Sequence, residues 1–246
     1  LATSVVIVGP SGFACAPGPT YDEWAATDGA AGRINLDAVQ EAFKTSENPT
    51  DFETRVNEIY EGDNLVLIRS RQDNGTLILE GYEDLDGNGE IDTATDDELF
   101  SIVKQHDNHE LRGHGANGYY RSSFGPGNFL FTYLLVSSMT GPRYYSTPYS
   151  RVGTMRANRT NYRAGSTYKS QVSRNTNYFG KQKNFHGSKY SNAGRNISKP
   201  RSSYLASSKA SGAFKASKAG VRSQWGSSAS RRSSGGFRGG GGAQSI

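Results

Sequence analysis

The chain has 246 residues, a length that suits one or two domains, with 34% hydrophobic residues and a net charge of +5. Its charges are divided between two halves: all 23 acidic residues lie within 22–110, whereas residues 111–246 carry 22 basic residues and no acidic one. This division excludes a uniformly basic enzyme. No apolar run reaches the roughly 18–20 residues that a membrane span needs, which excludes a polytopic membrane protein. A single cysteine excludes an internal disulfide framework and any multi-cysteine metal site.

Residues 1–19 are expected to form an apolar leader and a tether. The first eight residues (LATSVVIV) are apolar and uncharged, and Ala14 directly precedes the only cysteine, Cys15. This arrangement resembles the end of a bacterial lipoprotein signal peptide, in which a small residue precedes the cysteine that becomes lipidated. The resemblance implies an exported protein with a lipid anchor at Cys15. The alternative is an ordinary buried N-terminal strand that contains one reduced cysteine.

Residues 20–140 are expected to form an acidic α+β domain that begins with two short helices. Asn35 is suited to cap the first helix, and the apolar residues that follow share one face. They are Leu36, Val39, Ala42 and Phe43. The second helix follows Pro49 and begins with a capping box formed by Thr50 and Glu53. Its apolar residues, again at helical spacing, are Phe52, Val56, Ile59 and Tyr60.

A β-hairpin follows the two helices. Two apolar runs flank Asn74-Gly75, a dipeptide that tolerates the two positive φ angles of a tight turn. The simplest register places Arg69 opposite Glu80, a favourable cross-strand pair. The strands are expected at 65–72, 76–82 and 99–105, and together they make a small antiparallel sheet. Helices followed by such a sheet define the α+β class.

The apolar run at 128–139 (NFLFTYLLVSSM) is too short to cross a membrane. A buried core helix or strand is the expected structure for it. The alternative is a segment that docks on a membrane surface or on a partner.

The segment that follows the hairpin resembles the calcium loop of the EF-hand family, with the pattern Asp-x-Asp-x-Asn-Gly starting at Asp84. The resemblance implies five ligands, of which Glu90 contributes its backbone carbonyl: Asp84, Asp86, Asn88, Glu90 and Asp92. Position 12, a bidentate Glu in the family, is Thr95 here, and Asp96, Asp97 or Glu98 could replace it in a longer loop. We expect one weak, structural calcium site, with a dissociation constant on the order of 0.1–1 mM. The alternative is a solvated acidic turn that binds no specific ion.

Three histidines, His106, His109 and His114, lie close together in the sequence near Glu110. Their order, His-x-x-His-Glu, matches neither zinc-protease motif with its interleaved Glu. A polar loop is therefore expected, and a catalytic zinc site is the alternative. The sequence shows no nucleophile with its base and no phosphate-binding or dinucleotide-binding loop.

Residues 141–246 are predicted to be a disordered cationic tail. Of these 106 residues, 36 are Ser or Gly and 20 are basic. The few apolar residues that remain cannot bury enough surface to offset the conformational entropy of folding. Aromatic residues recur every 10–12 positions between Tyr168 and Phe237. The residues expected to bind polyanions are Arg143, Arg151, Arg156, Arg159, Arg163, Lys169, Arg174, Arg231, Arg232 and Arg238.

Three kinds of partner suit such a tail. Anionic envelope polymers or lipid headgroups would be held by charge. Nucleic acid would add base stacking on the aromatic rings. The third partner is the acidic half of the protein itself, either within one chain or between copies that self-associate.

The sequence as a whole predicts a non-enzymatic, exported bacterial envelope protein, anchored at the outer surface or in the periplasm. It would bind calcium weakly and adhere through its tail to anionic polymers or to other copies. The alternative is a nucleic-acid-binding protein that uses the tail. A third reading is a zinc-dependent hydrolase that uses the three histidines.

Overall fold

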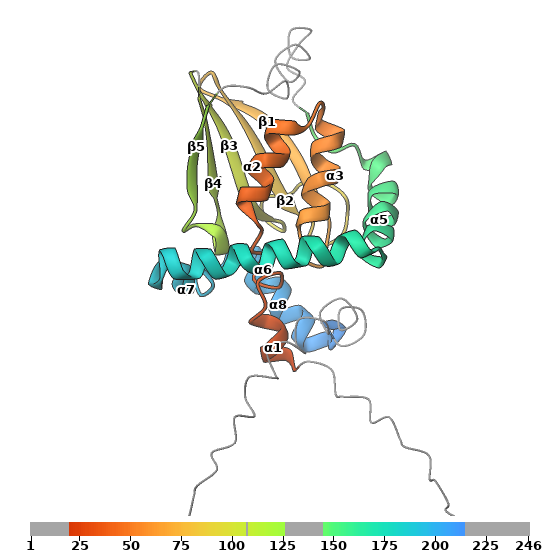
Figure 1. The fold of residues 1–246 in the computed structure, drawn as a ribbon. Helices are drawn as coiled ribbons and strands as arrows, with labels where there is room; N and C mark the ends of the chain where they lie inside the picture. The colour runs from red at the N-terminus through yellow and green to blue at the C-terminus, as the bar shows by residue number, and fades with distance from the viewer. Residues whose placement is uncertain (1–19, 107, 126–144, 215–246) are drawn as a thin grey trace, which may run out of the picture.

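The computed structural model of the protein describes residues 20–106, 108–125 and 145–214. It has the α+β architecture that the sequence predicts, with further helices after the sheet (Figure 1). The helices before the sheet are α1 (Tyr21–Ala25), α2 (Leu36–Thr45) and α3 (Pro49–Ile59). The sheet contains β1 (Val66–Asp73), β2 (Thr76–Glu83), β3 (Asp97–Gln105), β4 (Asn108–Gly113) and β5 (Arg121–Phe124), with the 3-10 helix η1 (Gly115–Asn117) before β5. The later helices are α5 (Tyr149–Ala164), α6 (Ser166–His186), α7 (Ser188–Ala193) and α8 (Lys199–Ser211).

Helix α3 starts differently from the prediction. The side chain of Asn48 accepts a hydrogen bond from the backbone N–H of Asp51 at 2.9 Å, and Pro49 occupies the first turn, where its missing N–H is not needed. The expected capping box of Thr50 and Glu53 is therefore wrong. The side chain of Glu53 is fully buried and faces the interior, so its carboxylate does not reach back to the start of the helix.

The five strands form an antiparallel meander in the order β1-β2-β3-β4-β5. The predicted register of the hairpin is confirmed, because Arg69 pairs with Glu80 and its Nη2 lies 2.7 Å from the carboxylate. The turn uses positive φ angles at Asn74 and Gly75, 47° and 81°. The predicted third strand is β3, which begins two residues earlier. The pairing of β4 and β5 was not predicted.

The outer edge of β1 is covered by residues from much later in the chain. Ser146 forms an isolated antiparallel bridge with Arg69. The backbone N–H of Ser70 donates to the carbonyl of Tyr145 at 2.8 Å, and that of Thr147 donates to the carbonyl of Ile68 at 2.9 Å. The chain therefore returns to the first strand before it enters α5.

Helices α2 and α3 lie side by side on one face of the sheet and supply seven of the 24 buried residues of the main core (Figure 1). Phe43 of α2 and Phe52 of α3 meet edge to face with ring centroids 5.8 Å apart, an arrangement that aromatic pairs favour. The predicted apolar faces of both helices are buried, as are the residues of the hairpin that share one face of the sheet: Val66, Ile68, Leu77 and Leu79.

The prediction of a disordered tail is wrong for residues 149–211, which form α5, α6, α7 and α8. Aromatic residues that were expected to bind nucleic acid are instead buried: Tyr168, Tyr178, Phe179, Tyr190 and Phe214. The predicted boundary at 140, the apolar run at 128–139 and residues 215–246 lie outside the described part of the chain.

Arginines of two late helices, α5 and α8, pair with carboxylates in the acidic half. Arg151 of α5 pairs with the buried Glu53 of α3 at 2.5 Å. Arg201 of α8 is itself buried and lies 2.9 Å from the carboxylate of Asp97 at the start of β3. Arg151 and Arg201 thus contact the acidic half of their own chain, which was the third kind of partner considered for the basic residues. Composition alone did not reveal this pairing, because the carboxylates that complete it lie about 100 residues away in the sequence.

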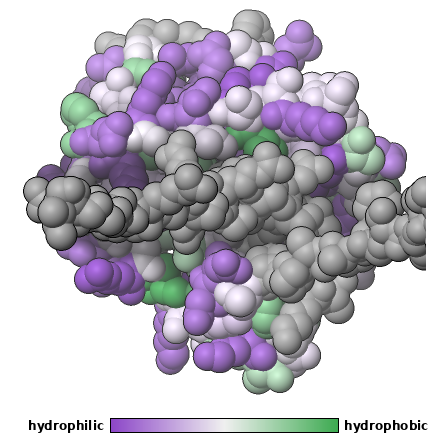
Figure 2. All heavy atoms as spheres, turned by 60° about the horizontal axis from the view of Figure 1, so that its bottom comes forward, coloured by the Kyte–Doolittle hydropathy of each residue, from purple (hydrophilic) through white to green (hydrophobic). Residues whose placement is uncertain are grey.

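The end of the molecule that carries α1 and α8 is mostly hydrophilic where its described residues are visible, with small and separate hydrophobic areas (Figure 2). Within 20–106, 108–125 and 145–214, no helix is both long and apolar enough to cross a membrane.

Candidate metal site

The site lies in the loop between β2 and β3. Asp84 comes directly after β2 and Asp96 directly before β3, so the two ends of the loop are fixed by the ladder that joins these strands. Within the loop, Gly89 has a φ angle of 81°, a conformation that residues with a side chain rarely adopt. The EF-hand-like pattern therefore lies on a hairpin, as the strand before it suggested.

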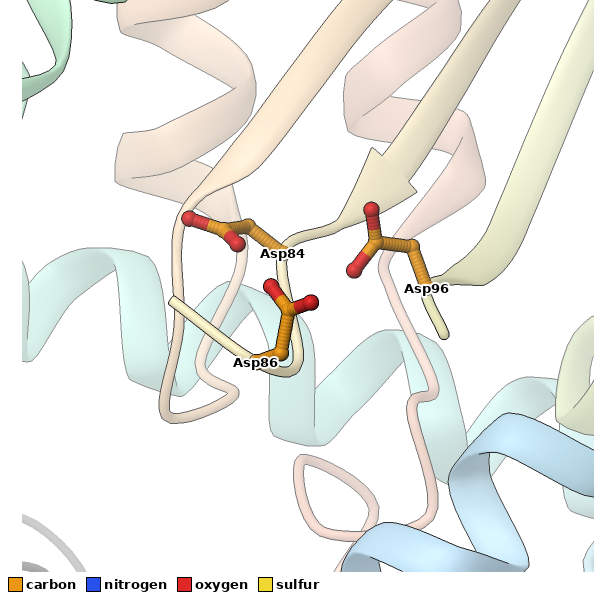
Figure 3. A group of neighbouring side chains, drawn as sticks. All are labelled: Asp84, Asp86 and Asp96. Carbon is orange, nitrogen blue, oxygen red and sulfur yellow. The ribbon is translucent and has the colours of Figure 1, made fainter. Parts of the chain in front are cut away.

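Three carboxylates converge in this loop. Asp84, Asp86 and Asp96 each offer one oxygen, and these oxygens all lie within 4.8 Å of one another. In Figure 3 the carboxylate of Asp86 rises between those of the other two residues. Oxygens on opposite sides of one Ca²⁺ lie about 5 Å apart, given bond lengths of roughly 2.3–2.6 Å. The spacing therefore suits a single hard cation.

Asp84 supplies the strongest sign that this group is a site. Its side chain is buried, with 1% exposure. One oxygen, Oδ2, accepts a hydrogen bond from the backbone N–H of Gly89 at 3.2 Å, whereas the buried Oδ1 has no hydrogen-bond partner among the described residues. Burial raises the pKa of this carboxyl above its usual value. A bound cation would compensate a buried carboxylate oxygen of this kind.

Of the three candidates to replace the ligand at position 12, Asp96 is the one whose carboxylate joins the group. Its two oxygens accept hydrogen bonds from the backbone N–H groups of Leu85 and Asp92, at 3.0 and 2.9 Å, and burial raises its pKa to about 6. The other two candidates are engaged elsewhere. The carboxylate of Asp97 binds Arg201, and that of Glu98 lies 3.3 Å from Nε2 of His114.

The remaining predicted ligands lie in the same loop but outside the three-carboxylate group. Asn88 donates its backbone N–H to Asp86 at 3.0 Å and accepts from the backbone N–H of Glu90 at 2.6 Å. Asp92 is exposed and accepts from the backbone N–H of Ala94 at 2.8 Å. These short-range bonds hold the loop in a tight curl around the acidic group.

Helix α5 covers the outer side of the loop. A Cβ atom on Gly89 would lie 3.0 Å from Cγ2 of Val152, so the loop packs closely against the helix. Arg156 donates from Nη2 to the carbonyl of Gly87 at 2.7 Å and lies 3.5 Å from Oδ2 of Asp84. No local sequence pattern indicates this particular contact, because it joins the acidic loop to a segment that was predicted to be disordered.

The three histidines do not come together. His109 is buried on the helix-covered face of the sheet, stacked on Phe124 with ring centroids 5.4 Å apart. Nε2 of His114 lies 2.7 Å from the hydroxyl of Ser101. Ser101 pairs with Glu80 across the β2–β3 ladder, and both side chains lie on the face of the sheet that α2 and α3 do not cover. His106 is exposed at the end of β3. Within the described residues, the acidic loop supplies the one group of three metal-binding side chains.

Several basic residues predicted to bind polyanions contact the protein itself. Arg151 and Arg156 pair with carboxylates, as described above, and Arg159 and Arg163 donate to backbone carbonyls, among them that of Gly62. Arg174 donates to Gln171, and Lys169 is exposed. Four predicted residues lie outside the described ranges: Arg143, Arg231, Arg232 and Arg238.

Comparison of the chain with protein-family models, with curated proteins and with solved structures finds no match. The geometry of the loop is therefore the basis for its assignment. Cys15, the predicted lipidation site, lies outside the described residues.

Proposed function

We propose that the protein is a non-enzymatic calcium-binding protein of the cell envelope, in which calcium stabilises the β2–β3 loop. The observation that carries this proposal is the group formed by Asp84, Asp86 and Asp96, together with the unpartnered, buried Oδ1 of Asp84. Carboxylate oxygens are the ligands that hard cations prefer. The loop is curled by its own hydrogen bonds, so a cation would not have to order it.

Calcium is favoured over magnesium by the character of the loop. Calcium accepts 6–8 oxygens in irregular geometry, so backbone carbonyls of the loop and water can complete a shell that the three carboxylates begin. Magnesium demands near-octahedral geometry at a shorter distance and releases its water reluctantly. We therefore expect calcium to bind at least ten times more tightly than magnesium.

The expected affinity agrees with an extracellular location. A single loop with few charged ligands suits the weak class, with a dissociation constant on the order of 0.1–1 mM. Such a site fills only where calcium is millimolar, which supports export and the lipid anchor proposed at Cys15. Cell fractionation with a lipid label tests this part of the proposal, and Cys15→Ser should release the protein from the membrane fraction.

Calorimetric titration of the full chain with calcium tests the metal site. At 5 mM calcium and a dissociation constant of 0.5 mM, binding adds about 1.4 kcal/mol to the free energy of unfolding, or roughly 3–6 °C in melting temperature. Asp86→Asn should remove both the heat and the shift, because it removes one carboxylate of the group. Asp86 is exposed, so the variant should still fold.

Glu90→Gln is the matched control. It removes one negative charge from the same loop but keeps the backbone carbonyl, so calcium binding should persist. A wild-type protein that shows neither heat nor a shift at 5 mM calcium would contradict the proposal. An Asp86→Asn variant that binds like the wild type would contradict the assignment of this group.

A further inference from the structure

A cavity of about 240 Å³ lies between helix α5 and the segment that leads into β1, beside the acidic loop. Three arginines on one face of α5 line it, spaced at i, i+3 and i+7. The residues that line the cavity include Arg156, Arg159, Arg163, Asp63, Asn64 and Asp84. The side chain of Arg156 is 52% exposed and marks the open side, whereas Arg159 is 6% exposed.

Two of these arginines have no carboxylate partner within the described ranges. Arg159 donates to the carbonyls of Asn64 and Gly62, the latter at 2.6 Å. Arg163 donates to the carbonyls of Tyr60 and Gly62 at 2.9 and 2.8 Å. Burial, with the charge of Arg163 close by, lowers the pKa of Arg159 to about 9. Carbonyl dipoles only partly compensate two neighbouring guanidinium charges, so an anion in the cavity would be stabilised.

The nearby carboxylates compensate these two charges only in part, because Asp63 and Glu61 attract Arg163 and Glu83 attracts Arg159, yet burial still lowers the pKa of both arginines. Asp63 accepts a hydrogen bond from the hydroxyl of Tyr204 at 2.9 Å. Asp84 belongs to the candidate metal site. A cation held there would neutralise Asp84 and remove its repulsion of an anion, so the two sites share one residue and should influence each other.

We propose that this cavity binds a tetrahedral oxyanion, a sulfate or phosphate group, through the three arginines of α5, and that calcium in the adjoining loop strengthens the binding. The second half rests on the proposed function, whereas the first half does not. The guanidinium fork presents several N–H donors to such a group. The group could be a free ion or an ester on an anionic polymer, since both present the same oxygens.

Titration calorimetry with sodium sulfate, with sodium chloride of equal ionic strength as the blank, tests the anion site. The wild type should give a saturable heat with one sulfate per chain. Arg163→Gln and the more exposed Arg156→Gln should each weaken binding about tenfold or more, the expected loss for one charge-assisted hydrogen bond. Lys169→Gln is the matched control, because it removes one exposed charge from α6 and leaves the cavity intact.

The calcium arm separates the two proposals. Calcium should tighten sulfate binding at least fivefold, and Asp86→Asn should abolish that gain while leaving binding without calcium unchanged. Calcium heat without sulfate heat would overturn the anion site and leave the metal site standing. Arg163-dependent sulfate heat without calcium heat would support the anion site and overturn the coupling.

A final arm identifies the source of the oxyanion. Dextran sulfate that binds more tightly than free sulfate, and that loses this advantage in Arg163→Gln but not in Lys169→Gln, supports a polymer ligand. Binding of free sulfate alone supports a small ion. Equal binding of dextran sulfate by the wild type and by Arg163→Gln, together with no saturable heat from sulfate, would overturn the site.

Discussion

The guanidinium of Arg201 on α8 lies against the carboxylate of Glu83 at the end of β2, although 118 residues separate them in the sequence. Both side chains are buried, with exposures of 1% and 0%. The hydroxyl of Tyr60 donates to the same carboxylate, and Asp97 accepts from Nε of the arginine at 2.9 Å. This network fixes α8 to the end of β2 and the start of β3.

Removing the arginine should destabilise the whole fold. Arg201→Met leaves Glu83 buried without its cation, so the free energy of unfolding should fall by about 3–5 kcal/mol in urea denaturation. The double variant with Glu83→Gln should recover part of this loss, because only the Asp97 carboxylate then lacks the cation that paired it. Lys199→Gln, at an exposed position of the same helix, should stay within about 0.5 kcal/mol of the wild type. A single variant as stable as the wild type would contradict the network.

Two phenylalanines of α6 test whether this helix is packed in solution. Phe179 is 6% exposed and belongs to the main core, whereas Phe185 is 84% exposed. Phe179→Ala should lower the free energy of unfolding by about 3–5 kcal/mol, and Phe185→Ala should change it by less than about 0.5 kcal/mol. Equal and small effects in thermal denaturation would instead favour the disordered tail that composition predicts.

Gly89 and Gly75 separate backbone strain from packing, because both have a φ of 81°. A Cβ at Gly75 would meet nothing within 4 Å, whereas one at Gly89 would press on α5. Gly75→Ala should cost about 1–2 kcal/mol, the usual penalty of the left-handed region. Gly89→Ala should cost at least 1 kcal/mol more through overpacking, and should reduce the calcium-induced rise in melting temperature. Equal losses would show that the loop does not pack on the helix.

Acid should destabilise the protein through His109. Burial, with Lys104 nearby, lowers the pKa of this imidazole below the usual 6.5, so the unfolded chain takes up a proton that the folded chain does not. The free energy of unfolding therefore falls as the pH falls below about 6.5, by up to 1.4 kcal/mol for each pH unit. Burial raises the pKa of Glu98 to about 7, which acts in the opposite direction, so variants must isolate the histidine.

Denaturation at pH 7.5 and at pH 5.5 measures this contribution. His109→Gln should lose less stability than the wild type between the two values. His106→Asn, at an exposed position of the β3–β4 turn, should behave like the wild type. The same pH response in all three proteins would refute a role for His109.

The hairpin and the helix faces could be predicted because their signals are local. Asn74-Gly75 fixes the turn, and the register that places Arg69 opposite Glu80 follows from it. The spacing within the β2–β3 loop is also a local signal, and Asp84 and Asp86, which it predicts to be neighbours, lie in the same acidic group. Asp96 could only be one of three candidates, because the start of β3 decides which carboxylate turns toward the loop.

The late helices could not be predicted, because their stability depends on remote contacts. A segment rich in Ser, Gly and Arg lacks the apolar content of an independent domain. Its arginines reach buried carboxylates, as Arg151 does with Glu53, and rings such as Tyr178 and Phe179 enter a core built mainly by the first half of the chain. A composition count treats these residues as solvated.

The return of the chain to β1 has a consequence for behaviour at high concentration. An open strand edge presents unpaired N–H and C=O groups to which a second molecule can add. Residues 145–147 already bond Ile68 and Ser70 along that edge. The protein thus carries its own protection against ordered aggregation on this side of the sheet, and a change that frees this segment would create a template for fibril growth.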